Sequence, residues 1–377
     1  MAETTLATAS RIQKWNAEFF AEYVRDNAFF PYMGAVSKNV LSPIVVDKSL
    51  VSAGQTVNLP LVTRLKGKGV QGNNQLTGNE EALGNYNMPI SVEWNRNGVK
   101  VTKREEHWTE IDLRNAAKMM LKTWAAETLR DDIITALMAV DGTSRIAGKP
   151  TSTPDATALT PLEAYTAQVE ATKNAWMVAN SDRYLFGKLV ANAVSGVHAT
   201  ALLTLDTTDD RLTAAMLTLA KTRAKAADPH IRPFKSDAAL GREYFVVFVS
   251  SLGMRDLKAD TTILSANREA RPRDVAENPI FQDGDLIYDG MIIREVPEIP
   301  VVVGVGNGGS DVAPAFLCGA QSVGVAWGQP VQSQVEDADY GFRQGVAVEE
   351  LRGVAKMVFN GKQHGMLTIW HSAPASA

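Results

Sequence analysis

The sequence predicts a mixed α+β fold organised around one long helix. Residues 109–140 contain no glycine or proline and are rich in strong helix formers. At about 1.5 Å per residue, such a helix would be about 48 Å long. Residues 57–65 and 88–94 precede it with the two-residue periodicity of strands, and further β-rich runs follow from residue 244. This order of a hairpin, a long helix, a mixed region and returning strands is the basis of the prediction.

Composition narrows the class of protein. The chain has 377 residues, enough for two or three domains' worth of core, and a net charge of -4, which gives no basic footprint for sequence-specific nucleic-acid binding. It has no apolar run long enough to cross a membrane, and its first residues lack the pattern of a secretory signal. The single cysteine, Cys318, excludes an intrachain disulfide. We therefore expect synthesis in the cytosol and no membrane partner.

The N-terminal region carries an unusual aromatic load. Residues 10–30 have the pattern of an amphipathic helix, and Trp15, Phe19 and Phe20 lie on its broad apolar face. Chain termini are usually disordered unless something holds them. Two interpretations remain open: a helix packed on its own domain, or an arm whose aromatics anchor it on a neighbouring subunit.

The strands before the long helix predict a two-stranded ribbon, with Val99 and Val101 extending its second strand beyond a turn at 95–98. Its connecting segment, 67–87, is rich in glycine and asparagine and long for a hairpin tip. A two-stranded ribbon is marginally stable in water, so it must lie on its own chain or on another.

Charges of opposite sign flank the tip of this ribbon. Lys66 and Lys68 lie on one side, and Glu80 and Glu81 on the other. This separation suits ion pairing across an interface, while a solvated loop would carry the same residues.

The long helix has an apolar face and a basic row. Thr109 and Asp112 can cap its start, and Asp141-Gly142 can stop it. The expected apolar face consists of Leu113, Ala117, Met120, Leu121 and Trp124. The basic row consists of Arg114, Lys118 and Lys122 at i, i+4 and i+8, and it is either a solvated face or a contact with a polyanion.

The second half mixes helices and strands. Residues 150–161 are expected to form a linker or long loop, followed by helices in 161–180 and 209–227 and a buried strand at 244–250. Further strands are expected in the segments 285–303, 312–327 and 345–371, the last folded around a turn at Asn360-Gly361.

The search for catalytic motifs is mostly negative. Gly304, Gly306 and Gly309 match G-x-G-x-x-G, but Pro314 breaks the helix that a dinucleotide site requires there. The five histidines are too far apart for a metal site, and Cys318 sits in an apolar strand. Acidic pairs such as Asp131-Asp132, Asp209-Asp210 and Glu349-Glu350 are expected at solvated positions. The sequence predicts no catalytic, cofactor or metal site, and hence no enzyme.

The ribbon and helix together resemble the major capsid proteins of tailed phages, specifically the N-four-like podovirus group. The runs that carry this resemblance are GKGVQGNNQLTGNEEAL (67–83), EHWTEIDLRNAAKMMLKTWAAETLRDDIITAL (106–137), EYFVVFVSSLGMRDLKAD (243–260), NPIFQDGDLIYDGMIIREVPEIP (278–300), FLCGAQSVGVAWG (316–328) and DYGFRQGVAVEELRGVAKMVFNGKQHGMLTI (339–369). They occur in the expected order and leave only about 145–230 without a clear match.

The resemblance implies the Hong-Kong-ninety-seven-type (Johnson) capsid fold in four parts. These are an N-terminal arm (1–50), an extended loop (51–106), a peripheral domain with the spine helix (107–150 and 335–377), and an inserted axial domain (151–334). Hexamers and pentamers would then form the icosahedral head of a tailed phage. In this fold family the spine faces the lumen, so Arg114, Lys118 and Lys122 would meet packaged double-stranded DNA.

The implied partners are other copies of the chain, the packaged DNA, a portal protein, and scaffolding and decoration proteins. The implied location is the virion, after assembly in the host bacterial cytoplasm. A fused scaffolding segment is not expected, and nothing favours a crosslink from Lys66 or Lys68 to Asn360 over plain contacts. Two alternatives remain: the shell of a cellular encapsulin-type nanocompartment, and a nucleotide-dependent enzyme using the Gly304–Gly309 loop.

Overall fold

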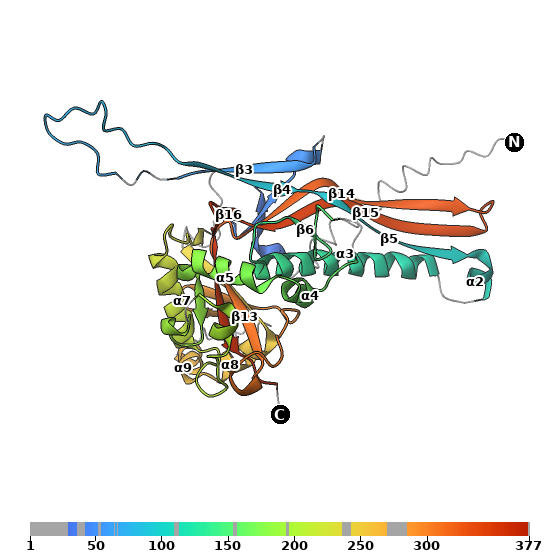
Figure 1. Cartoon of the computed structure of the whole chain (residues 1–377). Coiled ribbons are helices and arrows are strands. Elements are labelled where there is room, and N and C mark those ends of the chain that lie inside the picture. Colours follow the sequence, from blue (N-terminus) through green and yellow to red (C-terminus); the bar gives the residue numbers. More distant parts are fainter. Residues whose placement is uncertain are drawn as a thin grey trace.

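The chain forms an elongated body with projections on opposite sides (Figure 1). A ribbon extends from one side, a long hairpin lying over a long helix extends from the other, and a second sheet with its helices lies below. The computed structural model describes residues 29–35, 42–51, 54–63, 65, 67–108, 113–153, 157–193, 196–235, 243–269 and 285–375. The account below is confined to these segments.

The long helix is α3 (Leu113–Met138), whose 26 residues span about 39 Å. Its buried stripe repeats every four residues, through Ala117, Leu121, Ala125 and Leu129. The helix is therefore confirmed, but one residue of its expected apolar face is wrong. Met120 is 68% exposed because a helix turns by about 100° per residue, which rotates Met120 away from Leu121. The expected cap residues at 109 and 112 lie outside the described residues.

The first sheet covers this helix. It contains β1 (Met33–Ala35), β2 (Ile44–Asp47), β14 (Val323–Ala338), β15 (Arg343–Lys356), β6 (Arg145–Ile146), β7 (Lys149–Pro150) and, paired with β15, β5 (Glu93–Thr102). Strands β14 and β15 form the long antiparallel hairpin, and β5 runs antiparallel to β15.

The expected continuation of the ribbon past a turn at 95–98 is wrong. Residues 93–102 form one uninterrupted strand, which pairs with β15 from Arg352↔Glu93 to Arg343↔Thr102. The ladder with β15 satisfies the backbone of 95–98 in extended form, so no turn is needed there.

The second sheet lies beside the C-terminal half of α3. Its strands are β11 (Asp285–Tyr288), β12 (Met291–Glu295), β10 (Glu243–Val249), β13 (Val312–Cys318), β18 (Met366–Ser372), β8 (Tyr184–Phe186) and β9 (Phe234–Lys235). The helices of this half are α4 (Pro161–Thr166), α5 (Glu170–Ala179), α6 (His198–Leu202), α7 (Ala214–Ala226), α8 (Ser251–Ala259) and α9 (Thr261–Glu269). The predicted buried strand at 244–250 is confirmed, because residues 245–249 of β10 are buried.

The C-terminal strands β15 and β18 were expected to pair with each other, but they do not. Strand β15 pairs with β14 in the first sheet, whereas β18 pairs with β13 in the second. The turn at Asn360-Gly361 belongs instead to a small hairpin between the sheets, formed by β16 (Val358–Phe359) and β17 (Lys362–Gln363). The last strands of the chain are therefore divided between the two sheets.

One continuous apolar core joins these parts. It contains Leu129 of α3, Val325 and Val346 of the first sheet, and Phe248 and Trp370 of the second. Shared burial of this kind makes the helix and both sheets one packed unit. Among the described helices, none is long and apolar enough to cross a membrane.

Candidate assembly surfaces

The ribbon has an anchored base and an uncovered tip. Strands β3 (Thr56–Val62) and β4 (Asn85–Ser91) pair antiparallel, as the sequence predicts. At the base, Val57, Met88 and Ile90 are buried against residues of the first sheet. Beyond the paired strands, Leu65, Leu76 and Leu83 are each more than half exposed, at 57%, 62% and 60%. The tip extends away from the body (Figure 1), and these apolar side chains are exposed to solvent.

The glutamates of the tip shape their own loop. Glu81 Oε2 accepts a hydrogen bond from the amide of Gly67 at 2.5 Å, and Glu80 Oε2 accepts one from Gly78 at 2.7 Å. Both side chains remain exposed, as does Lys68, while Lys66 lies outside the described residues. Their ion pairing with a neighbour stays a prediction.

The aromatic N-terminal residues Trp15, Phe19 and Phe20 also lie outside the described residues. The described chain begins at Phe29, which is buried and meets Phe248 edge-to-face with ring centroids 4.8 Å apart. Tyr32 meets the same ring at 5.5 Å. These contacts fix residues 29–32, which lie within the predicted arm 1–50, on the second sheet.

The basic row lies on the N-terminal half of α3. Lys118 and Lys122 are half-buried, and each interacts with another group of its own chain. The side chain of Arg114 is not among those that the structure describes. Met119 beside them is 68% exposed, and Thr123 and Glu127 are exposed as well. The solvent side of this half of the helix is therefore mixed rather than uniformly basic.

A buried charge cluster joins the helix to the long hairpin. Arg352 Nη1 lies 2.6 Å from Asp132 Oδ2, and its Nε lies 2.7 Å from Glu350 Oε1. Asn95 of β5 donates to the same Glu350 oxygen at 3.1 Å. All three charged side chains are fully buried. The cluster therefore ties α3, β15 and β5 into a stiff unit.

The acidic pairs were expected at solvated positions. In each of three pairs, one of the two residues is buried instead. Asp132, Glu350 and Asp210 are buried, and Asp210 accepts hydrogen bonds from the amides of Lys188 and Asp206. A signal for Glu350 was present in the sequence. In a strand, alternate residues share a face, so Glu350 and Arg352 fall on the buried face of Val346, Val348 and Val354.

A second buried cation lies at the end of the same strand. Lys356 Nζ donates to the carbonyl of Ala139, just after α3, and to Gln363 Oε1 at 3.3 Å. Burial lowers the pKa of this amine to about 7, because the apolar surroundings disfavour its charged form. The side chain holds the small hairpin against the end of the long helix.

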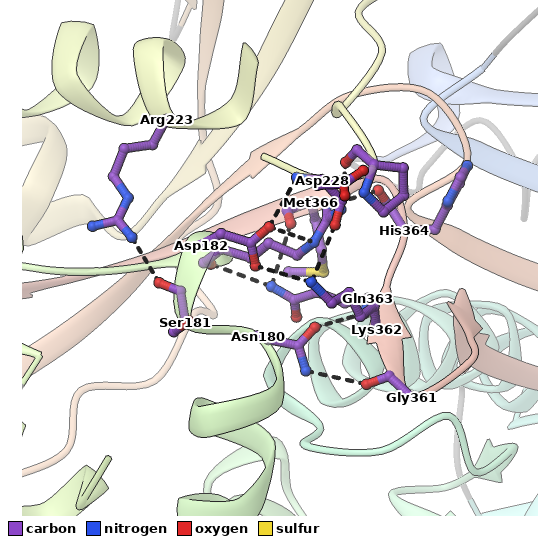
Figure 2. Close-up of polar contacts among 12 residues, drawn as sticks. Asn180, Ser181, Asp182, Arg223, Asp228, Gly361, Lys362, Gln363, His364 and Met366 are labelled. Atoms are coloured by element: carbon purple, nitrogen blue, oxygen red, sulfur yellow. Dashed lines mark hydrogen bonds and ion pairs between the residues drawn. The ribbon is translucent and has the colours of Figure 1, made fainter. Parts of the chain in front are cut away.

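Figure 2 shows the polar joint between that hairpin and the segments around Asn180 and Asp228. Asn180 accepts from the amide of Gln363 at 2.8 Å and donates to the carbonyl of Gly361 at 3.3 Å. Lys362 donates to the carbonyl of Asp228 at 3.1 Å, and the amide of Asp228 donates to Asp182 at 3.0 Å. The joint holds the small hairpin against residues 180–182 and 228 through side chains that satisfy backbone groups.

The glycines, histidines and cysteine that were considered for a cofactor, metal or catalytic site have structural roles instead. Residues 304–309 connect strands and contain one short 3₁₀ turn, η7 (Asn307–Gly309), and β13 begins at Val312 without an α-helix in between. Among the described residues, no group of histidine, cysteine and carboxylate side chains could hold a metal ion. Burial lowers the pKa of His198, His364 and His371 to about 4 and raises that of Cys318 to about 12, so all four are held neutral.

These features define a class of protein: a structural subunit with a stiff frame and a projecting ribbon suited to contact other subunits. Comparison with known proteins makes the assignment specific. Residues 3–375 match the family described as phage capsid protein, so the chain belongs to the phage capsid protein family.

Individual capsid proteins are similar to this chain in sequence and in fold, which supports the family assignment. The chain is 25% identical to the major capsid protein of Pseudomonas phage KPP25 over 98% of both chains. The solved capsid asymmetric unit of cyanophage Pam1 shares 40% identity over 100% of both chains, with a TM-score of 0.79. The capsid of Ralstonia phage GP4, 21% identical over 92% of this chain and 90% of that one, has the same fold with a TM-score of 0.68.

The expected identity is therefore confirmed at the level of the class. The chain is a phage major capsid protein with the Hong-Kong-ninety-seven-type fold, and a component of the virion. Its family is a family of structural proteins. The relatives do not favour the encapsulin alternative. The narrower N-four-like assignment stays a prediction.

Proposed function

We propose that this chain assembles as hexamers and pentamers into the icosahedral head of a tailed phage, enclosing double-stranded DNA. The observation that supports this best is the ribbon tip, which exposes Leu65, Leu76 and Leu83 far from the body of its own chain. Exposed apolar side chains on a projecting element mark a contact with another molecule. Many such contacts, repeated with closed symmetry, make a shell without any catalytic step.

The parts of the chain take roles that follow from their structure. The stiff unit of α3, β15 and β5 acts as the frame, while the ribbon, within the proposed extended loop 51–106, lies across a neighbouring subunit. Residues 1–50 form an N-terminal arm, with Trp15, Phe19 and Phe20 as anchors on a neighbour. Residues 107–150 and 335–377 make the peripheral domain, and 151–334 make the axial domain.

Other molecules complete this proposal. A portal protein, scaffolding and decoration proteins act with the shell, which forms in the host bacterial cytoplasm. Arg114, Lys118 and Lys122 face the lumen and make weak, sequence-independent contacts with packaged DNA. Because Lys118 and Lys122 are half-buried and already interact within the chain, each contributes only modestly.

The DNA contact is tested by replacing all three cations with glutamine. We expect shells that still form but release DNA at lower salt than the wild type. A matched control replaces Lys225 and Lys258, exposed on α7 and α8, with glutamine. Equal genome retention and equal salt sensitivity in all three proteins would contradict the lumenal contact.

The shell itself is tested by electron microscopy of the purified protein with nuclease-protected nucleic acid measured in parallel. Closed icosahedral particles and protected double-stranded DNA from infected cells are the expected result. A small oligomer without closed particles would contradict the assembly. Particles that contain a co-purifying enzyme and no DNA would contradict the phage head.

A further inference from the structure

The turn between β14 and β15, residues 338–342, presents an aromatic ring to solvent in an unusual backbone conformation. Tyr340 is fully exposed, at 108% of its reference area. Its φ is 51°, in the left-handed region, as are those of its neighbours Asp339 and Gly341. A residue other than glycine, asparagine or aspartate in this region costs about 1 kcal/mol or more. The chain therefore accepts strain to hold a ring that is fully exposed in its own copy.

A complementary surface lies beside this turn, on α2 (Lys103–Trp108). The amide of Lys103 donates to the carbonyl of Phe342 at 2.9 Å, which joins the turn to the start of the helix. Both lie at the end of the projection farthest from the second sheet (Figure 1). The guanidinium of Arg104 lies 4.0 Å from the ring centroid of Trp108, which is itself 66% exposed. A tyrosine ring packs well against such a cationic and aromatic surface.

The charges of the two surfaces are also complementary. Asp337 at the end of β14 and Asp339 on the turn are exposed, and Lys103 and Arg104 on the helix are exposed. Asp339 has only a weak partner in its own chain, because Arg343 Nε lies 4.0 Å from its carboxylate and both side chains are about 60% exposed. Glu105 and Glu106 follow on α2 with the opposite sign, so the favourable contact is confined to Lys103 and Arg104 and to the ring of Trp108.

We propose that Tyr340 anchors a contact between two copies of this chain, seating on the Arg104–Trp108 surface of the adjacent copy. This proposal rests on the proposed function, because it names one of the contacts that would hold the shell together. In this proposal the contact is heterologous, with the turn of one copy on α2 of the next. A heterologous contact repeats from copy to copy and closes into a ring around a rotation axis.

The test uses Tyr340→Asn, because asparagine tolerates the left-handed region. The free subunit is expected to unfold at the same denaturant concentration as the wild type or a higher one. The fraction of protein sedimenting as shells is expected to fall about tenfold or more, as for an anchor residue. Tyr340→Phe keeps the ring and is expected to assemble like the wild type.

A charge exchange tests the partner surface. Arg104→Glu should reduce the shell fraction, and adding Asp337→Lys in the same chain should restore part of it, since the pair then attracts across copies with reversed signs. The proposal would be overturned if Tyr340→Asn formed shells with the yield and stability of the wild type. It would also be overturned if Tyr340→Asn and Tyr340→Gly both destabilised the free subunit. Failure of the wild type to form shells would contradict the proposed function instead.

Discussion

The guanidinium of Arg352 lies 2.6 Å from the carboxylate of Asp132, and both side chains are fully buried. This pair connects β15 to the C-terminal part of α3, over 200 residues apart in the sequence. Glu350 and Asn95 complete the cluster from β15 and β5. The long helix and the long hairpin therefore cannot slide past each other without exposing or separating buried charges.

Removing the shared cation should unfold the subunit more easily. Arg352→Met leaves Asp132 and Glu350 buried without a counter-charge, and such a loss costs about 3–5 kcal/mol. The measurement is the free energy of unfolding of the unassembled subunit in urea. Arg343→Met is the matched control, because the pair with Asp339 is exposed and worth less than about 1 kcal/mol. Equal effects of the two substitutions would show that the buried cluster does not hold the frame.

The polar joint of Figure 2 should depend on Asn180. Asn180→Ala leaves the buried amide of Gln363 unsatisfied, which costs about 1–3 kcal/mol, and removes a hydrogen bond to the carbonyl of exposed Gly361. Calorimetry should show a lower unfolding temperature, and hydrogen exchange should quicken at 358–363. The control is Asn192→Ala, which removes a single half-buried hydrogen bond to Phe186. Unchanged exchange at 358–363 would contradict a role in the joint.

Acid should destabilise the subunit through its buried histidines. The pKa of His198 is lowered to about 4 by burial, from about 6.5 in the unfolded chain. Between these values the unfolded state binds more protons, so stability is complete above about pH 6.5 and falls as the pH approaches 4. His198→Leu should flatten the dependence of the unfolding free energy on pH in this window. The control is His230→Leu, which removes an exposed histidine. If the slope in His198→Leu were the same as in the wild type, the acid sensitivity would come from groups other than His198.

Lys356 should give a pH dependence of the same sign in a more alkaline window. Its pKa is about 7 in the folded chain and about 10.5 when unfolded, so the unfolded state binds the extra proton between these values. The cost of burying its charge is greatest below pH 7 and disappears as the pH rises toward 10.5. Relative to Lys356→Met, the wild type should therefore gain stability with pH across this interval. Parallel curves for the two proteins would contradict the lowered pKa.

Much of the fold could be predicted because local patterns and tertiary structure agree. The glycine-free run of α3 and the alternation in β3 and β4 carry their structure in their own residues. Pairing between distant segments could not be predicted in this way. Whether residues 93–102 continue the ribbon or join β15 depends on ladder partners 250 residues away. The same holds for β18, whose partner is β13 rather than β15.

The candidate interface residues were harder to predict than the fold. Charged residues in the sequence suggested the surfaces, yet Glu350 and Arg352 are buried because the strand places them on its apolar face. Tyr340 gives no such signal, because only the backbone conformation of its turn shows that the ring is held away from its own chain. Residues in contact with another copy follow no periodicity of their own chain, so the sequence predicts their element better than their identity.

The central claim is that the ribbon is an intersubunit element. Hydrogen exchange of residues 67–84, compared between unassembled subunits and assembled shells, tests it most directly. The tip is exposed in the single chain, so its amides should exchange rapidly there and be strongly protected in shells. Equally rapid exchange in both states would contradict the account, because the ribbon would then lie on no neighbour.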